Sequence, residues 1–221
     1  MQVKLISYSQ PPKDSPEEIH NIKDLVSFCA RVSNPSNQFN TETAEKLITY
    51  LIKHKHFSPF EMVNVCLEIE TTRDISRQIL RHRSFCFQEF SQRYADPVKE
   101  LQFEVREARC QDPKNRQNSI GITDNALAEA WKIRQKRVIS VARQEYEWAI
   151  QNGIAKECAR VVLPEGNTTT RMYMNGTLRS WIHYVDVRSG NGTQLEHLLI
   201  AKECALVISE IFSMITEFVQ D

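Results

Sequence analysis

A regular run of apolar residues near the C-terminus restricts the fold more than any other feature of this chain. Its apolar positions are spaced alternately by three and four residues, which is the spacing of neighbours on one helix face. We therefore predict a helix over 198–219 whose apolar face is buried, either within the chain or against another subunit. That face comprises Leu198, Ala201, Ala205, Ile208, Phe212, Ile215 and Val219.

Strands are indicated by a period of two. From Val63 to Glu70 apolar and polar residues alternate, which predicts a strand with one buried and one solvated face. Residues 3–8 predict a shorter strand that ends before Pro11, and 103–106 predict a third. Strands and helices in a chain of 221 residues predict one mixed α+β domain, residues 1–221.

Further helices are predicted from caps and apolar spacing. The first begins at Pro16 and closes at Asn34, and the second has Asn40 as its N-cap and runs through Leu51. A long helix over 123–152 is expected to stop at Gly153. Shorter helices are predicted over 73–80 and 154–162, and a loop over 112–121.

Composition excludes several classes of protein. Lys+Arg and Asp+Glu number 28 each, so no overall charge attracts the chain to nucleic acid or anionic membranes. Hydrophobic residues make up 41%, and no apolar stretch approaches the roughly 20 residues of a membrane span. The six cysteines contain no C-x-x-C pair, and residues 1–10 have no signal-peptide core. A reducing, cytoplasmic location is expected, the host cytoplasm if the chain is viral.

Arginines concentrate between Arg73 and Tyr94. Five arginines and no lysine lie there, opposed only by Asp74 and Glu89. Arginine offers a planar fork of donors to phosphates, and the rings and amides between these arginines suit a planar base. The run predicts a site for a phosphorylated, planar ligand. A solvated helix end followed by an edge strand is the structural alternative.

Three later arginines join these candidates because they lie in apolar stretches. Arg160 is flanked by alanine and valine, and Arg179 and Arg188 are nine residues apart. A guanidinium in apolar surroundings is costly unless it reaches a carboxylate or a ligand. Pairing of Arg160 with a neighbouring glutamate, Glu157 or Glu165, is the alternative to ligand binding.

Other chemistries have less support. His54 and His56 are spaced for metal ligation, but no third ligand follows, so a pair of loop histidines is favoured. Cys86 lies among arginines that would stabilise a thiolate, yet it equally suits a small packed residue. The chain has no glycine-rich phosphate loop and no G-x-S-x-G elbow. The rival to an enzyme is a surface that stacks single-stranded nucleic acid, against which the zero net charge argues.

A known family has this pattern. R81-H82-R83, followed after seven residues by Ser91, resembles the R-H-R-x7-S signature of the flavin-dependent thymidylate synthases. The resemblance extends from about His54 to Glu196. It includes H56-F57-S58-P59-F60-E61 and A159-R160-V161-V162-L163-P164, and also Gln78, Arg171, Arg179, Arg188 and Gln194.

The resemblance implies long helices packed on an antiparallel sheet, in a homotetramer with active sites at subunit interfaces. It implies reductive methylation of dUMP to dTMP, with methylenetetrahydrofolate as the carbon donor. FAD would transfer hydride from NADPH or NADH, so no enzyme nucleophile is required. A family member that binds dUMP without turnover is a further alternative. No nucleic-acid or membrane partner is implied.

The resemblance also implies roles for individual residues. Arg188 would be catalytic, because a guanidinium near N3 of uracil stabilises the anionic base and directs electron density to C5. Ser91 would be a ligand contact, and no metal is implied. The implied FAD contacts are Ser58, Arg81, His82, Arg83, Glu89, Arg179 and His183. The implied dUMP contacts are Gln78, Arg81, Glu89, Phe90, Ser91, Gln92, Arg93, Arg160 and Arg188. Cys86, Met62, Thr177 and Gly192 depart from the residues usual in the family.

Overall fold

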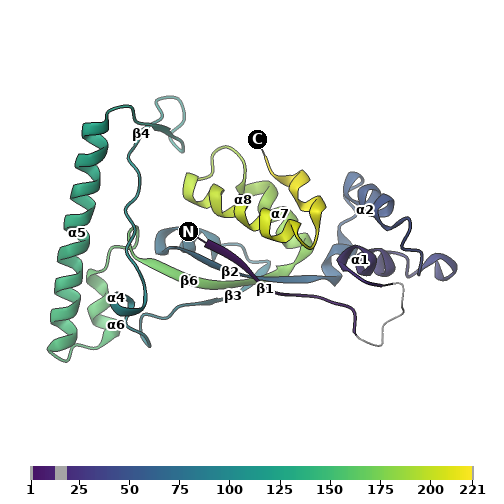
Figure 1. Ribbon diagram of the computed structural model, residues 1–221, viewed down its shortest axis with the longest axis horizontal. Helices are drawn as coiled ribbons and strands as arrows, with labels where there is room; N and C mark the ends of the chain where they lie inside the picture. The colour runs from purple at the N-terminus through teal and green to yellow at the C-terminus, as the bar shows by residue number, and fades with distance from the viewer. Residues whose placement is uncertain (1, 13–18, 221) are drawn as a thin grey trace.

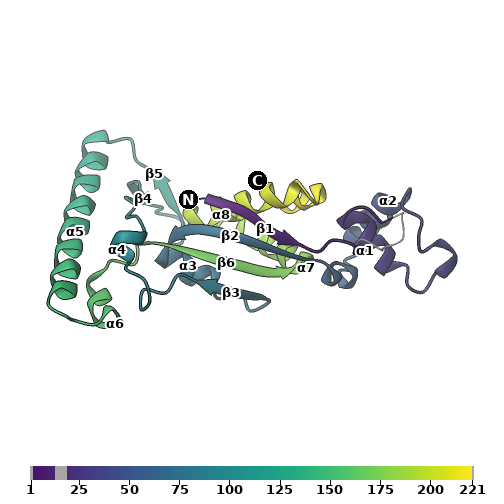
Figure 2. The same ribbon diagram turned by 60° about the horizontal axis from the view of Figure 1, so that its bottom comes forward.

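The computed structural model describes residues 2–12 and 19–220. The protein is elongated (Figure 1). A sheet forms the centre, with α1 and α2 at one end and α5 across the other (Figures 1 and 2). The elements are β1 (Gln2–Tyr8), α1 (Ile22–Ala30), η1 (Pro35–Asn37), α2 (Ala44–Lys53), η2 (Ser58–Met62), β2 (Asn64–Thr72), α3 (Arg73–Ile79), β3 (Phe85–Glu89), α4 (Pro97–Glu100), β4 (Arg109–Gln111), β5 (Ser119–Gly121), α5 (Asn125–Gln151), α6 (Lys156–Ala159), η3 (Arg160–Val162), β6 (Thr169–Thr177), α7 (Leu178–Arg188), α8 (Leu195–Ser209) and η4 (Ser213–Phe218).

The central sheet has four antiparallel strands in the order β1-β2-β6-β3. Leu67 of β2 lies opposite Leu5 of β1 and Met174 of β6, and Met174 also lies opposite Phe87 of β3. These side chains belong to the core or pack against it. On the opposite face Arg171 pairs with Glu70 at 2.7 Å. The apolar positions of β2 are fully buried, as predicted, whereas on the opposite face Asn64 is exposed, Cys66 and Glu70 are half-buried and Glu68 is buried.

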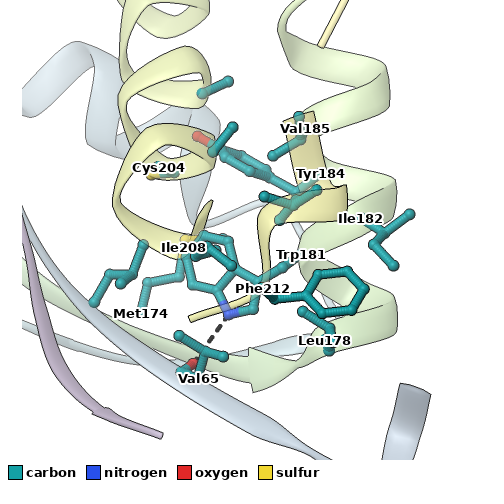
Figure 3. Close-up of a cluster of buried hydrophobic side chains, with 14 of the residues drawn as sticks. Val65, Met174, Leu178, Trp181, Ile182, Tyr184, Val185, Cys204, Ile208 and Phe212 are labelled. Atoms are coloured by element: carbon teal, nitrogen blue, oxygen red, sulfur yellow. Dashed lines mark hydrogen bonds between the residues drawn. The ribbon is translucent and has the colours of Figure 1, made fainter. Parts of the chain in front are cut away.

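The core lies between the sheet and helices α7 and α8, which cover one face of it (Figure 1). Trp181 and Tyr184 of α7 and Phe212 are fully buried there. Figure 3 shows the indole of Trp181 directed at the sheet, where its Nε1 donates a hydrogen bond of 2.9 Å to the carbonyl oxygen of Val65. This bond satisfies the only polar group of a side chain that is otherwise apolar.

Helix α5 is the longest element, with 27 residues. It begins after Asp124, whose side chain accepts from the backbone N–H groups of Ala126 and Leu127, and ends before Gly153, which has φ +78°. The predicted stop is confirmed, because glycine adopts this left-handed conformation without steric cost. A second, smaller core joins α5 to α4, α6 and η3; it comprises Val98, Tyr146, Ala149, Ala159 and Leu163.

The predicted C-terminal helix is interrupted. Helix α8 ends at Ser209, and the chain turns before η4 begins at Ser213. Of the predicted face, Ala201, Ala205, Ile208, Phe212 and Ile215 are buried, and Leu198 and Val219 are half-buried. The turn gives Phe212 an extended backbone, φ −147°, and brings its ring to 6.2 Å from that of Phe60. Continuous apolar spacing predicted burial correctly but not the break, because burial does not require one uninterrupted helix.

Three other helix predictions need correction. The first helix begins at Ile22, capped by Asn21, whose side chain accepts from the N–H of Asp24; the predicted start at Pro16 lies outside the described residues. The N-cap of α2 is Thr43 rather than Asn40. The predicted helix over 154–162 is divided into α6 and η3.

Strand predictions also need correction. Residues 103–106 form no strand; Phe103 makes only an isolated bridge to Thr168. The predicted loop 112–121 ends in β5, which pairs with β4 as a hairpin. Strand β6 was not predicted, although it is central in the sheet. Two methionines are the large apolar residues of its buried face, threonine and glycine fill the other buried positions, and Tyr173 is on the exposed face, so its periodicity is weak.

Candidate active site

The turn between α3 and β3 carries the R-H-R sequence. Helix α3 ends at Ile79, and the backbone N–H groups of Arg81 and His82 donate to the carbonyl oxygens of Gln78 and Ile79 at 3.3 and 3.0 Å. This tight turn leaves Arg81 and Arg83 exposed and His82 half-buried. Two exposed guanidinium groups therefore flank one imidazole.

Arg188, the last residue of α7, reaches this turn. Its Nε donates a hydrogen bond of 2.9 Å to Nε2 of His82. An imidazole nitrogen can accept only when it is unprotonated. Burial, followed by the positive charges of Arg188, His183 and Arg81, lowers the pKa of His82 to about 4. His82 is therefore neutral near pH 7, and Arg188 keeps its other donors for a ligand.

A buried polar network lies beside this pair. The ring of His197 is fully buried, with Nδ1 at 3.2 Å from Oε1 of Gln78 and Nε2 at 3.1 Å from Oη of Tyr184. Nε2 of Gln78 donates to Oε1 of Gln194 at 2.7 Å. Burial, followed by the charges of Arg188 and His82, lowers the pKa of His197 to about 3. The amide of Gln78, a predicted ligand residue, is thus held at both ends.

Glu89 closes the other end of β3. Its Oε1 accepts from the hydroxyls of Ser76 at 2.9 Å and Thr170 at 3.0 Å, and its Oε2 accepts from Nη1 of Arg77 at 3.3 Å. Helix α3 supplies two of these donors because it lies alongside the end of β3. Glu89 is therefore a fixed carboxylate next to exposed arginine.

The segment after β3 lies near this carboxylate. Nε of Arg93 donates to Glu157 at 3.1 Å in an exposed pair. Gln92 is buried, and within the described residues its Nε2 has no hydrogen-bond partner. Leaving a buried donor unpaired costs about 1–3 kcal/mol. Gln92 therefore offers a donor that a ligand or a second chain would satisfy. Arg160 is half-buried at the start of η3, directly after α6, whose Glu157 makes the pair with Arg93.

A pocket of about 480 Å³ lies beside the R-H-R turn. Its volume is within the range of about 300–1,000 Å³ that is typical of small-molecule sites. Arg179 at its wall forms an ion pair with Glu61. Ser58 is exposed next to Phe57 of the wall. The lining residues are Phe57, Glu61, Ser84, Arg179, Ser180, Ile182, His183, Asp186 and Phe218.

The predicted site residues thus fall into two clusters. The R-H-R cluster contains Gln78, Arg81, His82, Arg83, Arg179, His183 and Arg188, with Ser58 nearby. The Glu89 cluster contains Glu89, Phe90, Ser91, Gln92, Arg93 and Arg160. The R-H-R turn precedes β3 and the Glu89 cluster begins at its last residue, and a five-residue strand spans about 16 Å. Gln78 lies between the two ends, because its neighbours Ser76 and Arg77 donate to Glu89.

Sequence reasoning missed the residues that support the site from behind, above all His197 and Tyr184. A weak signal was present. His197 is in helical register with Ala201, Cys204 and Ile208, all buried. A titratable residue on a buried helix face requires a polar partner, which here is supplied by Gln78 and Tyr184.

The two histidines considered as metal ligands, His54 and His56, pack against a tyrosine ring. Within the described residues, no group of three or more His, Cys, Asp or Glu is arranged to hold a metal ion. The rings of His54 and Tyr50 lie 4.2 Å apart, and His56 lies 6.3 Å from Tyr50. Across residues 2–12 and 19–220, no helix is long and apolar enough to cross a membrane.

A solved structure has the same fold. It is the UMP/dUMP methylase PolB from Streptomyces cacaoi bound with 5-Br dUMP, which superposes with a TM-score of 0.78 at 24% identity, covering 98% of this chain and 93% of that one. The fold is thus one that a nucleotide-methylating enzyme uses.

Sequence comparison gives the family. The family model described as thymidylate synthase complementing protein matches residues 17–212. A probable flavin-dependent thymidylate synthase from Paramecium bursaria Chlorella virus 1 is 44% identical over 217 residues, covering 98% of both chains. The flavin-dependent thymidylate synthase of Synechocystis sp. is 46% identical over 212 residues, covering 96% of this chain and 94% of its own. This chain belongs to the thymidylate synthase complementing protein family, the family that its R-H-R-x7-S signature resembles.

Proposed function

We propose that this chain is a flavin-dependent thymidylate synthase that reductively methylates dUMP to dTMP. Family membership over residues 17–212 and relatives matched over nearly their whole length support the proposal. The single observation that carries it is the approach of Arg188 to His82 in the R-H-R turn. That arrangement holds a guanidinium beside a neutral imidazole in a strongly basic setting, where an anionic nucleotide would bind.

The residues of the R-H-R cluster suit FAD. Arg81, Arg83 and Arg179 would hold the phosphates of FAD. The adjoining pocket offers an apolar wall at Phe57 and polar groups at Ser84 and His183. Ser58, His82 and Glu89 are the remaining proposed contacts. When bound, FAD supplies hydride transfer, which no amino-acid side chain performs.

The proposed dUMP contacts are Gln78, Arg81, Glu89, Phe90, Ser91, Gln92, Arg93, Arg160 and Arg188. Arg188 would stabilise negative charge at N3 of the uracil and so direct electron density to C5, where the new carbon bond forms. The unpaired Nε2 of Gln92 supports this assignment, since a ligand carbonyl would satisfy it. Ser91 is proposed as a ligand contact, with no covalent step.

A homotetramer would bring the two clusters together. The R-H-R turn and the Glu89 cluster lie at opposite ends of β3 within one chain, so the Glu89 cluster of one subunit would face the R-H-R cluster of another. Helix α5 supports subunit association because it exposes an apolar stripe at heptad spacing. The stripe comprises Leu127, Trp131, Val138, Val141 and Trp148, each 45–58% exposed.

Methylenetetrahydrofolate as the carbon donor and NADPH or NADH as the reductant follow from the proposed reaction. We also propose that residues 1–221 act as one domain in the cytoplasm. All six cysteines, each among the described residues, are free, as a reducing compartment requires.

An absorption spectrum tests the proposal first. Protein reconstituted with FAD should retain a bound-flavin spectrum after desalting, and titration with dUMP should shift it. Turnover with methylenetetrahydrofolate and NADPH should then yield dTMP. Binding of both ligands without dTMP would indicate a member that lacks turnover. Loss of FAD on desalting and no response to dUMP would overturn the proposal, and a salt-sensitive affinity for single-stranded nucleic acid would favour the rival.

A further inference from the structure

A chain of side-chain hydrogen bonds runs from β4 to α7 beside the site. Nη2 of Arg109 donates to Oε1 of Glu196 at 2.7 Å, and Nε2 of Gln194 donates to Oε2 of Glu196 at 3.0 Å. Gln194 accepts from Gln78 at 2.7 Å, and Gln78 is bonded to His197 at 3.2 Å. The chain ends where His197 meets Tyr184 at 3.1 Å. It therefore connects a hairpin, three helices and the segment before α8.

The direction of this chain is set at Glu196. An ionised carboxylate only accepts hydrogen bonds, so Gln194 must turn its NH2 group to Glu196 and its oxygen to Gln78. Arg109 and Arg106, whose nitrogens lie 2.7 and 3.5 Å from Oε1, keep Glu196 ionised. Burial alone would raise the pKa of Glu196, but the hydrogen bond from Arg109 and the other favourable contacts lower it overall.

The same reasoning fixes the remaining members. Gln78 must turn its NH2 group to Gln194 and its oxygen to Nδ1 of His197. Nδ1 of His197 must therefore carry the proton, and the bare Nε2 accepts from the hydroxyl of Tyr184. The orientations of both amides and the tautomer of His197 are therefore fixed, because each depends on the preceding member of the chain.

We propose that Glu196 is a positioning residue that fixes the orientation of the Gln78 amide, so that Gln78 presents its second N–H to the nucleotide. The identity of the nucleotide, dUMP, rests on the proposed function, but the direction of the hydrogen-bond chain does not. Glu196 does not itself touch the ligand; it acts through Gln194.

A single substitution should reverse the chain. In Glu196→Gln, Arg109 still requires an oxygen, so the new amide would turn its NH2 group to Gln194. Gln194 and Gln78 would then flip, and the proton of His197 would move from Nδ1 to Nε2. A second change should restore the original direction. In Gln194→Glu/Glu196→Gln, the carboxylate at 194 again accepts from Gln78, so the proton returns to Nδ1.

Nitrogen-15 NMR of the imidazole side chains at pH 7 tests the direction without any ligand. His197 is assigned by its absence from the spectrum of His197→Gln. We expect a protonated Nδ1 in the wild type and the double variant, and a protonated Nε2 in Glu196→Gln. A protonated Nε2 in the wild type, or the same tautomer in all three proteins, would overturn the proposal.

Calorimetric titration with dUMP tests the consequence. Loss of one correctly directed hydrogen bond corresponds to about tenfold weaker binding. We expect Glu196→Gln to bind dUMP about tenfold more weakly and the double variant to recover most of that loss, with similar melting temperatures in all three proteins. Equal weakening in both variants would indicate a purely structural role and contradict the proposal. If wild-type protein binds no dUMP, the proposed function fails, whereas the NMR result still decides the direction of the chain.

Discussion

Nε of Arg188 lies 2.9 Å from Nε2 of His82, which joins the last residue of α7 to the turn between α3 and β3. The bond requires a neutral imidazole, and burial, followed by the surrounding positive charge, lowers the pKa of His82 and so maintains that state. The proposed catalytic guanidinium is therefore oriented before any ligand binds. This relationship has a direct consequence for activity.

Arg188→Ala should abolish dTMP formation while the fold remains intact. Removing one group that stabilises developing charge lowers kcat by at least about 100-fold. Arg188→Lys should recover little, because a lysine lacks the planar fork. The measurement is chromatographic detection of dTMP, with melting temperature as the fold control and exposed Arg116→Ala as the matched variant. Unchanged dTMP formation in Arg188→Ala would remove Arg188 from the catalytic role.

Stability should fall in acid because His197 is buried as a neutral ring. Its pKa is about 3 in the folded chain and 6.5 ordinarily, so below pH 6.5 the unfolded chain binds the proton and the folded chain does not. The free energy of unfolding therefore decreases as pH falls from 6.5 toward 3, by about 2 kcal/mol at pH 5 for this group. Urea unfolding at pH 7 and pH 5 measures the decrease. His197→Gln should lack this part of the pH dependence, and an equal decrease in both proteins would contradict the assignment.

Gly176→Ala should destabilise the sheet. A Cβ at this position would lie 2.4 Å from Cδ1 of Phe85, whose ring packs 4.8 Å from that of Trp181. Overpacking of this kind costs about 1–3 kcal/mol. Gly121→Ala is the control, because a Cβ there meets nothing within 4 Å and should change stability by less than about 0.5 kcal/mol. Urea midpoints compare the two, and equal midpoints would show that Phe85 moves aside freely.

Charges placed on the stripe of α5 should dissociate the proposed tetramer. Val138 and Val141 are 52% and 50% exposed, and glutamates there would be unpaired charges in an apolar interface. Val138→Glu/Val141→Glu should therefore elute with a smaller mass in light scattering. Glu129→Lys, on the opposite side of the helix, should leave the mass unchanged. A monomeric wild-type protein would refute the assembly itself.

The sequence by itself determined those features that depend only on residues close to one another along the chain. The buried apolar face of β2 and the stop of α5 at Gly153 are local, because strand burial and left-handed backbone follow from residue type and spacing. The R-H-R-x7-S signature is also local, and it sufficed to indicate the family and to select the site residues, whose roles remain predictions.

Only the tertiary structure decided the rest. Strand β6 is placed by pairing with β2 and β3, not by its own polar sequence, and the break after α8 lets Phe212 reach Phe60. The direction of the Glu196 chain depends on Gln78 meeting Gln194, which lies 116 residues away. Such contacts form between segments that only folding brings together, so periodicity and local motifs do not predict them.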